Sequence, residues 1–248
     1  MPRARWIPDS FATSAFGWSE ATAMKPGRKR AWLAWSSGKD SAWALHVARR
    51  SGDFDIVSLL TTVTEPHRRV SMHAVRQDVL ELQARAANLP LHRVVIPSPC
   101  PDEAYATAMR RAMESAKADG VTHVIFGDVF LEDVRNYRIV RLAEVGMTAH
   151  FPLWGQDTRE LAGDMIAGGL RAFVTCVDPQ RLAPSFAGAE YDMELLRNLP
   201  EDVDPCAENG EFHTCVVAGP MFEAPLPVRV GETVERDGFV FADVVPFG

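Results

Sequence analysis

A run of small polar and charged residues, Ser36-Ser37-Gly38-Lys39-Asp40-Ser41, follows the apolar residues 31–35 and precedes a helix-forming stretch. This order predicts a strand, a tight turn and a helix. The first N–H groups of a helix have no partner within the helix, and its dipole is positive at that end. We therefore expect an anion such as a phosphate group to bind at residues 36–41.

These six residues allow two other interpretations. A Walker loop requires glycine at the position of Leu33 and Ser or Thr after the lysine, where Asp40 stands, so that pattern fails twice. A serine-rich helix cap, in which Asp40 and Ser41 only satisfy amides of the first turn, remains an alternative. The strand before the motif and the helix after it favour phosphate binding.

A second cluster lies far along the chain, where Glu208, Asn209, Gly210, Glu211 and His213 fall within six residues. Carboxylates and imidazoles can transfer protons in catalysis. A solvated loop would also explain these polar residues. It would not explain the apolar run that follows at residues 215–222, which is expected to anchor the cluster against a core.

The elements between the two clusters alternate in type. Strands are predicted at residues 31–35, 55–63, 91–96 and 121–126, and helices at residues 42–50, 71–88 and 102–119. This alternation is typical of a doubly wound α/β fold with a parallel sheet, whose ligands bind at the carboxyl ends of the strands. After residue 147 the pattern changes, with a helix near 158–168 and a strand at 171–177, so we expect a smaller C-terminal α+β domain.

Composition excludes several classes of protein. A net charge of −7 and a pI near 5.5 provide no broad basic field, so nucleic acid is not an expected partner. The four cysteines are scattered without a C-x-x-C pair, which argues against a zinc site or a disulfide framework. No apolar run approaches the roughly 20 residues that span a bilayer, so a cytoplasmic protein without a membrane partner is expected.

The first cluster resembles the S-G-G-x-D-S signature of the PP-loop ATP pyrophosphatases at five of six positions, with Ser37 where the family usually has glycine. The second resembles the G-E-G-G-E-[YF]-[EH]-T motif of the diphthine–ammonia ligase family, an N-type branch of those enzymes. Both motifs in this order are more specific than either alone. The resemblance extends over residues 31–222. Asn209 and the pair Phe212-His213 are similar to the bacterial branch.

This resemblance implies the HUP-type α/β fold and binding of ATP with Mg²⁺, the metal being held by Asp40. It divides the chain into a poorly ordered extension (1–28), an ATP-binding PP-loop domain (29–147) and a substrate-binding and catalytic domain (148–248). The residues expected to bind the nucleotide are Ser36, Ser37, Gly38, Lys39, Asp40, Ser41, Thr61, Thr62, Gly127 and Asp128. Those expected to be catalytic are Lys39, Glu208, Glu211 and His213, and those expected to bind substrate are Arg138, Asn209, Gly210 and Thr214.

The function implied is an ATP-dependent ligase that adenylates a carboxylate, releases pyrophosphate and forms an amide with ammonia or an amine. The carboxylate, on a small molecule or a protein, stays open. Two alternatives remain: a tRNA-modifying PP-loop enzyme, disfavoured by charge and scattered cysteines, and a non-catalytic nucleotide sensor, which has no use for the second motif. For Arg138, a surface ion pair is the alternative to ligand binding. The oligomeric state, including a homodimer, is left open.

Overall fold

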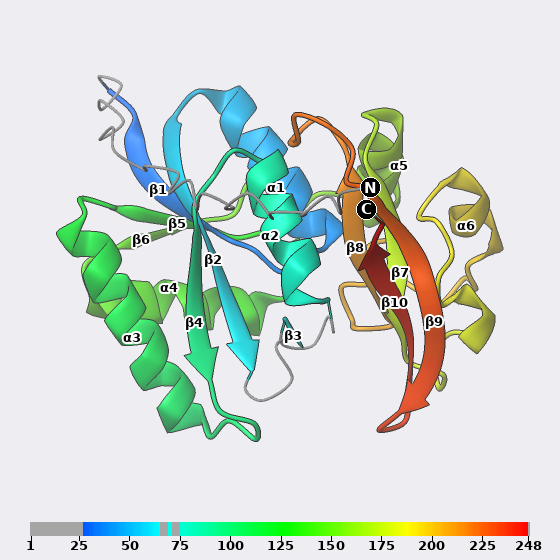
Figure 1. Ribbon diagram of the computed structural model, residues 1–248. Coiled ribbons are helices and arrows are strands. Elements are labelled where there is room, and N and C mark those ends of the chain that lie inside the picture. Colours follow the sequence, from blue (N-terminus) through cyan, green and yellow to red (C-terminus); the bar gives the residue numbers. More distant parts are fainter. Residues whose placement is uncertain (1–26, 65–68, 71–74, 248) are drawn as a thin grey trace, which may run out of the picture.

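The computed structural model describes residues 27–64, 69–70 and 75–247 (Figure 1). The extension predicted for residues 1–28 therefore lies outside the described residues, except for its last two. The first sheet contains five parallel strands in the order β4-β2-β1-β5-β6. Their bounds are Lys29–Ala34 (β1), Phe54–Thr64 (β2), Leu91–Ile96 (β4), His123–Ile125 (β5) and Thr148–His150 (β6). The short β3, Arg69–Val70, pairs antiparallel with the end of β2.

The strand order places a topological switch between β1 and β5. From β1 the chain proceeds to β2 and β4 on one side, and it returns to β5 and β6 on the other. The loops that follow β1 and β5 therefore lead to helices on opposite faces of the sheet. Ligands of doubly wound folds bind at this point.

Four helices cover the two faces of this sheet: Lys39–Ser51 (α1), Gln77–Ala86 (α2), Asp102–Ala118 (α3) and Glu132–Glu144 (α4). Neighbouring strand residues point to opposite faces. Leu59 accordingly packs in the core with α1 and α2, whereas Leu60 packs in a separate core with α3 and α4. The sheet is thus buried on both sides, as expected for parallel strands.

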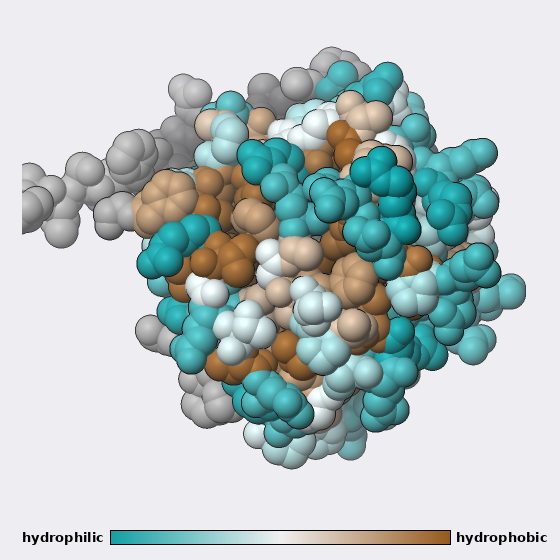
Figure 2. Space-filling model, turned by 90° about the vertical axis from the view of Figure 1, so that its right-hand side faces the viewer, coloured by the Kyte–Doolittle hydropathy of each residue, from teal (hydrophilic) through white to brown (hydrophobic). Residues whose placement is uncertain are grey.

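A second, antiparallel sheet follows in the order β8-β7-β10-β9. Its strands are Arg171–Val177 (β7), Phe212–Ala218 (β8), Val228–Arg236 (β9) and Phe239–Pro246 (β10), and its helices are Thr158–Ala167 (α5), Pro184–Phe186 (η1, a 3₁₀ helix) and Met193–Asn198 (α6). On the side of the molecule where this sheet lies, apolar and polar side chains are interleaved at the surface (Figure 2).

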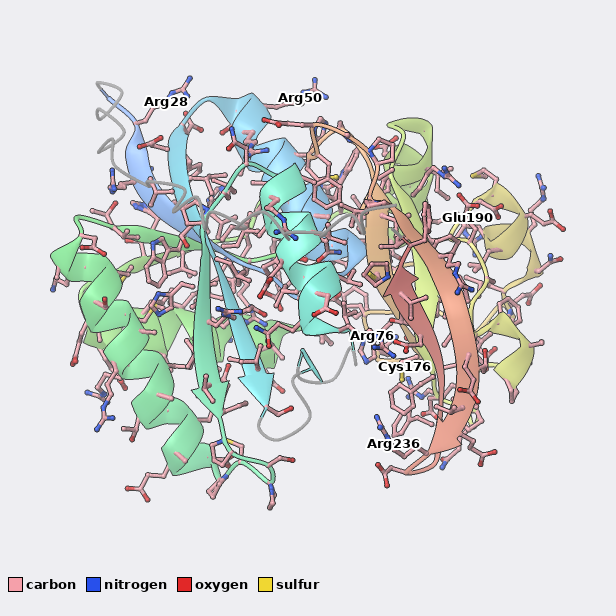
Figure 3. The ribbon with its side chains drawn as sticks, in the orientation of Figure 1. Arg28, Arg50, Arg76, Cys176, Glu190 and Arg236 are labelled. Carbon is pink, nitrogen blue, oxygen red and sulfur yellow. The ribbon has the colours of Figure 1, made fainter. Side chains whose placement is uncertain are left out.

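Helices α1 and α2 lie between the two sheets (Figure 1). They share one apolar core with β7 and β8. An ion pair adds a polar link, because Arg76 at the start of α2 contacts Asp243 of β10 at 2.6 Å. Figure 3 shows Arg76 where α2 meets the antiparallel sheet. Helix α1, which begins within the first motif, therefore packs against both sheets.

The fold class predicted from the sequence is confirmed, and the differences lie at element ends. α1 begins at Lys39, three residues before the predicted start, so the charged part of the first motif lies in the first helical turn. α2 begins at Gln77 instead of residue 71. β6 pairs with β5, so the parallel sheet extends past the boundary predicted at 147/148. Within the described residues, no helix is long and apolar enough to cross a membrane.

Candidate active site

The loop between β1 and α1 is braced by its own serines. The hydroxyl of Ser41 donates to the carbonyl of Gly38 at 3.0 Å and accepts from the amide of Ser36 at 3.3 Å. The amide of Gly38 donates to the hydroxyl of Ser36, also at 3.3 Å. These bonds fold residues 36–41 into a compact turn at the positive end of α1.

Ser37 occupies the left-handed region of backbone space, with φ of 73°. This explains why the related signature has glycine here, since a Cβ in that region costs about 1–2 kcal/mol. The side chain is 0% exposed, and among the described residues its hydroxyl has no hydrogen-bond partner. Ser37 therefore tolerates the glycine-like conformation and does not present its hydroxyl to the cavity.

Lys39 points away from the cavity. Its ammonium lies 3.0 Å from Oδ2 of Asp40, donates to the carbonyl of Cys206 and lies over the rings of Tyr191 and Phe212 at 5.6 and 5.7 Å. Burial by itself lowers the pKa of Lys39, but nearby negative charge, first that of Asp40, raises it above its ordinary value. Lys39 thus stays protonated. It joins the loop after β1 (the first loop) to the loop between α6 and β8 (the second loop).

The loop after β5 lies directly against the first loop. A Cβ on Gly127 would fall 2.7 Å from the carbonyl carbon of Asp40 and 2.8 Å from the amide nitrogen of Ser41. The next residue, Asp128, forms an ion pair with Arg138 at 3.2 Å, and the guanidinium of Arg138 lies 4.3 Å from the ring centre of Phe126. Arg138 thus faces the site, whereas Arg141, one helical turn later, pairs with Glu144 and lies over the ring of Tyr137 at 5.3 Å.

Glu208 is the carboxylate of the second loop that faces this region. Its Oε1 accepts a hydrogen bond from the amide of Val129 at 2.8 Å, which ties the second loop to the loop after β5. Burial raises the pKa of Glu208 to about 7, and the negative charges of Asp40 and Asp128 contribute to the rise. A carboxylate with this pKa can accept and release a proton near neutral pH.

The other carboxylate of the second loop, Glu211, has a different setting from the one expected. It is 2% exposed, and its Oε1 accepts from the side-chain amide of Asn209 at 3.1 Å and from the backbone of Asp204 at 3.3 Å. Nη1 of Arg181 lies 3.8 Å from the same Oε1 of Glu211. Neither Glu211 nor Asn209 lines the cavity described below. The bond between Asn209 and Oε1 of Glu211 holds the loop in shape, whereas Oε2 of Glu211 is buried without a hydrogen-bond partner among the described residues.

His213 is the second residue of β8 and lines the cavity. Burial lowers the pKa of His213 to about 4, and the positive charge of Lys39 lowers it further. A histidine with this pKa does not change its charge near neutral pH. The imidazole of His213 is therefore neutral at pH 7.

A cavity of about 560 Å³ opens at the switch point. Eleven of the residues predicted for the site line it: Ser36, Asp40, Ser41, Thr61, Thr62, Gly127, Asp128, Arg138, Glu208, Gly210 and His213. Six do not, although they adjoin it in sequence: Ser37, Gly38, Lys39, Asn209, Glu211 and Thr214. The two motifs nevertheless touch, since the amide of Lys39 donates to the hydroxyl of Thr214 at 3.1 Å across 175 positions of sequence.

The cavity suits a polyphosphate with a divalent cation. Asp40 Oδ1 and Thr61 Oγ1 belong to lining residues and are buried without a hydrogen-bond partner in the described part of the chain. No three metal-binding side chains cluster among the described residues. A Mg²⁺ ion would thus depend on one or two carboxylates plus phosphate oxygens, which is its usual mode. Asp40 is the residue that fits.

The sequence interpretation missed the apolar part of this cavity, where Tyr105 and Met109 of α3 face Tyr137 of α4. It also missed Gln83 of α2, which is fully buried. Gln83 follows Val79 and Leu80 at helical spacing on the buried face of α2. A polar residue within an apolar stripe was the signal that could have identified it.

The fold and the loop at its switch point define the class, a PP-loop α/β protein with an added antiparallel sheet. The diphthamide synthase N-terminal domain profile matches residues 29–149, and the diphthamide synthase C-terminal domain profile matches residues 157–242. The chain belongs to this family, that of the diphthine–ammonia ligases. Membership makes it an enzyme of the ligase type.

Two relatives are both named diphthine–ammonia ligase. The diphthine–ammonia ligase of Danio rerio is 26% identical over 234 residues, covering 84% of this chain and 90% of the relative. That of Schizosaccharomyces pombe is 33% identical over 88 residues, covering 34% of this chain and 14% of the relative. A solved structure, the U34-tRNA thiolase NcsA from Methanococcus maripaludis with its [4Fe-4S] cluster, aligns over 58% of each chain with 14% identity and a TM-score of 0.34.

Proposed function

We propose that this enzyme uses ATP to adenylate a substrate carboxylate and then forms an amide with ammonia or an amine. The observation that carries the proposal is the meeting of two motifs on one cavity. Asp40 of the phosphate loop and Glu208 of the second loop both line it, and the negative charge of Asp40 helps to raise the pKa of Glu208. A phosphate-binding loop and a carboxylate with a pKa of about 7 are what the two half-reactions need.

In the first half-reaction, an oxygen of the substrate carboxylate attacks the α-phosphorus of ATP, and the bond to the β-phosphate oxygen breaks with its electrons going to pyrophosphate. The turn at residues 36–41 and the positive end of α1 would hold the departing phosphates. Asp40 would hold Mg²⁺, which supplies positive charge against the charge that develops on pyrophosphate. Arg138 would orient an anionic group of the substrate.

In the second half-reaction, the nitrogen of ammonia or an amine attacks the acyl carbon, and AMP leaves with the electrons of the broken bond. The attacking nitrogen must lose a proton. Glu208 is the group we assign to accept it, because its pKa of about 7 keeps it partly ionised at neutral pH. This assignment replaces His213, which is too weak a base.

Substrate-dependent product analysis tests the proposal. Wild-type protein is incubated with α-labelled ATP, Mg²⁺ and ammonium, together with either the small-molecule or the protein fraction of a cell extract. We expect AMP and pyrophosphate with one fraction only. Once a substrate is in hand, labelling its carboxylate with ¹⁸O should transfer one ¹⁸O atom to AMP. Release of ADP and orthophosphate, or AMP without ¹⁸O, would contradict adenylation of a carboxylate.

A further inference from the structure

Gln83 is a buried amide in an otherwise apolar setting. It lies on the face of α2 that Val79, Leu80 and Ala84 bury, and it is 0% exposed. Burying an amide without hydrogen bonds costs about 1–3 kcal/mol in protein interiors. An apolar residue would pack at this position without that cost. The hydrogen bonds of the Gln83 amide must therefore offset it.

The amide of Gln83 joins α2 to two other segments, the loop after β1 and strand β8. Its oxygen accepts from the indole nitrogen of Trp35 at 2.9 Å, and its nitrogen donates to the carbonyls of Ser37 at 3.1 Å and Val216 at 2.8 Å. Both amide hydrogens are thus used. Only one orientation of the amide satisfies these partners, since a flip would place NH₂ against the indole N–H. The geometry fixes Gln83 as a three-way junction.

All three partners adjoin the candidate active site. Trp35 lines the cavity, and Ser37 is the strained residue of the phosphate loop. Val216 belongs to β8, the strand that begins with Phe212 and contains His213. The amide of Val216 also donates to the carbonyl of Ser37 at 2.9 Å. Gln83 therefore fixes the phosphate loop relative to the strand that follows the second loop.

Resting on the proposed nucleotide site, we infer that Gln83 is a positioning residue that holds Ser37 in its left-handed conformation and thereby sets the affinity for the polyphosphate of ATP. A non-glycine residue with φ near +73° needs outside contacts to stay there. The carbonyl of Ser37 receives two hydrogen bonds, one from Gln83 and one from the Val216 amide. Loss of the hydrogen bond from Gln83 loosens the loop, and it changes none of the cavity-lining side chains of Ser36, Asp40 and Ser41.

The first test compares Gln83→Met with Leu80→Ala. Gln83→Met keeps the volume and removes all three hydrogen bonds, whereas Leu80→Ala weakens the same buried helix face without a bond to the loop. Both should lower the midpoint of urea unfolding. Only Gln83→Met should weaken binding of ATP·Mg²⁺, by about tenfold in calorimetric titration. Equal affinities in the two variants would reduce Gln83 to a packing residue and overturn the inference.

A second variant keeps the shape of the side chain. In Gln83→Glu, an ionised carboxylate can still accept from Trp35 but has no hydrogen for the carbonyls of Ser37 and Val216. A protonated carboxyl can donate to one of them. The affinity of this variant for ATP·Mg²⁺ should therefore recover toward the wild-type value as pH falls, relative to wild type and Leu80→Ala measured at the same pH. A pH-independent ratio would overturn the inference.

Hydrogen exchange separates this inference from the proposed function. The amide of Val216 should exchange faster in Gln83→Met than in Leu80→Ala at matched global stability, because its acceptor on Ser37 becomes mobile. If wild-type protein bound no ATP·Mg²⁺, the proposed function would fail, and the exchange result would still decide whether Gln83 positions the loop. Unchanged exchange at Val216 would reject the positioning role.

Discussion

The α-carbon of Gly127 rests against the backbone of Asp40, so closely that a Cβ would lie 2.7 Å from the carbonyl carbon and 2.8 Å from the carbonyl oxygen of Asp40. Backbone atoms cannot rotate out of the way as side chains can. This contact joins the loops that follow β1 and β5, the two strands at the switch point. Any side chain at position 127 must push the phosphate loop away from its observed position.

Gly127→Ala should therefore destabilise the fold by about 1–3 kcal/mol, the usual range for overpacking, and weaken ATP·Mg²⁺ binding by at least about tenfold. Urea unfolding and calorimetric titration measure the two effects. Gly163→Ala provides the matched control, because Gly163 lies inside α5 with no atom within 4 Å of an added Cβ. That change should stabilise the helix by up to about 1 kcal/mol and leave nucleotide affinity unchanged. Wild-type affinity in Gly127→Ala would contradict the close-contact argument.

Ser37→Gly should raise the free energy of unfolding by about 1 kcal/mol, since it relieves the left-handed strain and removes a buried hydroxyl that lacks a partner among the described residues. Ser37→Ala separates the two causes, because alanine removes the hydroxyl and keeps the strain. We expect glycine to exceed alanine in stability. The ranking is measured by urea unfolding, and alanine equal to or better than glycine would show that φ at this position carries no strain.

Glu208→Gln should lower the rate of amide formation by about 10²-fold or more, the usual range for loss of a general base. In the wild type, Glu208 is protonated below its pKa of about 7 and ionised above it. The wild-type rate should therefore rise with pH through about 7, and the variant should lose that rise. Glutamine retains an oxygen for the Val129 amide, so the loop stays in place.

The control for this profile is His213→Asn, which should leave the rise near pH 7 where it is, because the pKa of His213 is about 4. A shift of the rate increase near pH 7 in His213→Asn, with none in Glu208→Gln, would reverse the two assignments.

The raised pKa of Glu208 also predicts how stability depends on pH. Its folded pKa lies above the ordinary value, so its contribution is most favourable below pH 4.5 and is lost as pH rises toward 7. Glu208→Gln should flatten that decline in urea unfolding.

Arg138→Gln should destabilise the protein in a pH-dependent manner. Burial already raises the pKa of Asp128, and Arg138 opposes that rise. Without the guanidinium the pKa of Asp128 rises further, so the stability deficit should grow as pH increases from about 4, reaching about 1–2 kcal/mol at neutral pH. Arg141→Gln on the same helix is the control, and it should change stability little because both partners of Arg141, Glu144 and the ring of Tyr137, are exposed. A deficit that is constant with pH would exclude Asp128 as the cause.

Local patterns in the sequence determined the fold class and the existence of both loops. Strand β4 spans Leu91–Ile96 and strand β7 spans Arg171–Val177, as predicted, because short apolar runs between turn residues depend little on distant contacts. The motif at residues 36–41 was identifiable for the same reason. Even the strain at Ser37 was foreseeable, since a glycine stands there in the related signature.

Tertiary structure decided the protonation states. The pKa values of Glu208 and His213 depend on burial and on the charges of Asp40, Asp128 and Lys39, all distant in sequence. The direction of the Lys39 side chain likewise depends on the carbonyl of Cys206. Gln83 gains its place at the site only because α2 packs between two sheets. Solvation and Coulomb energies depend on three-dimensional neighbours, and a linear pattern of residue types does not specify them.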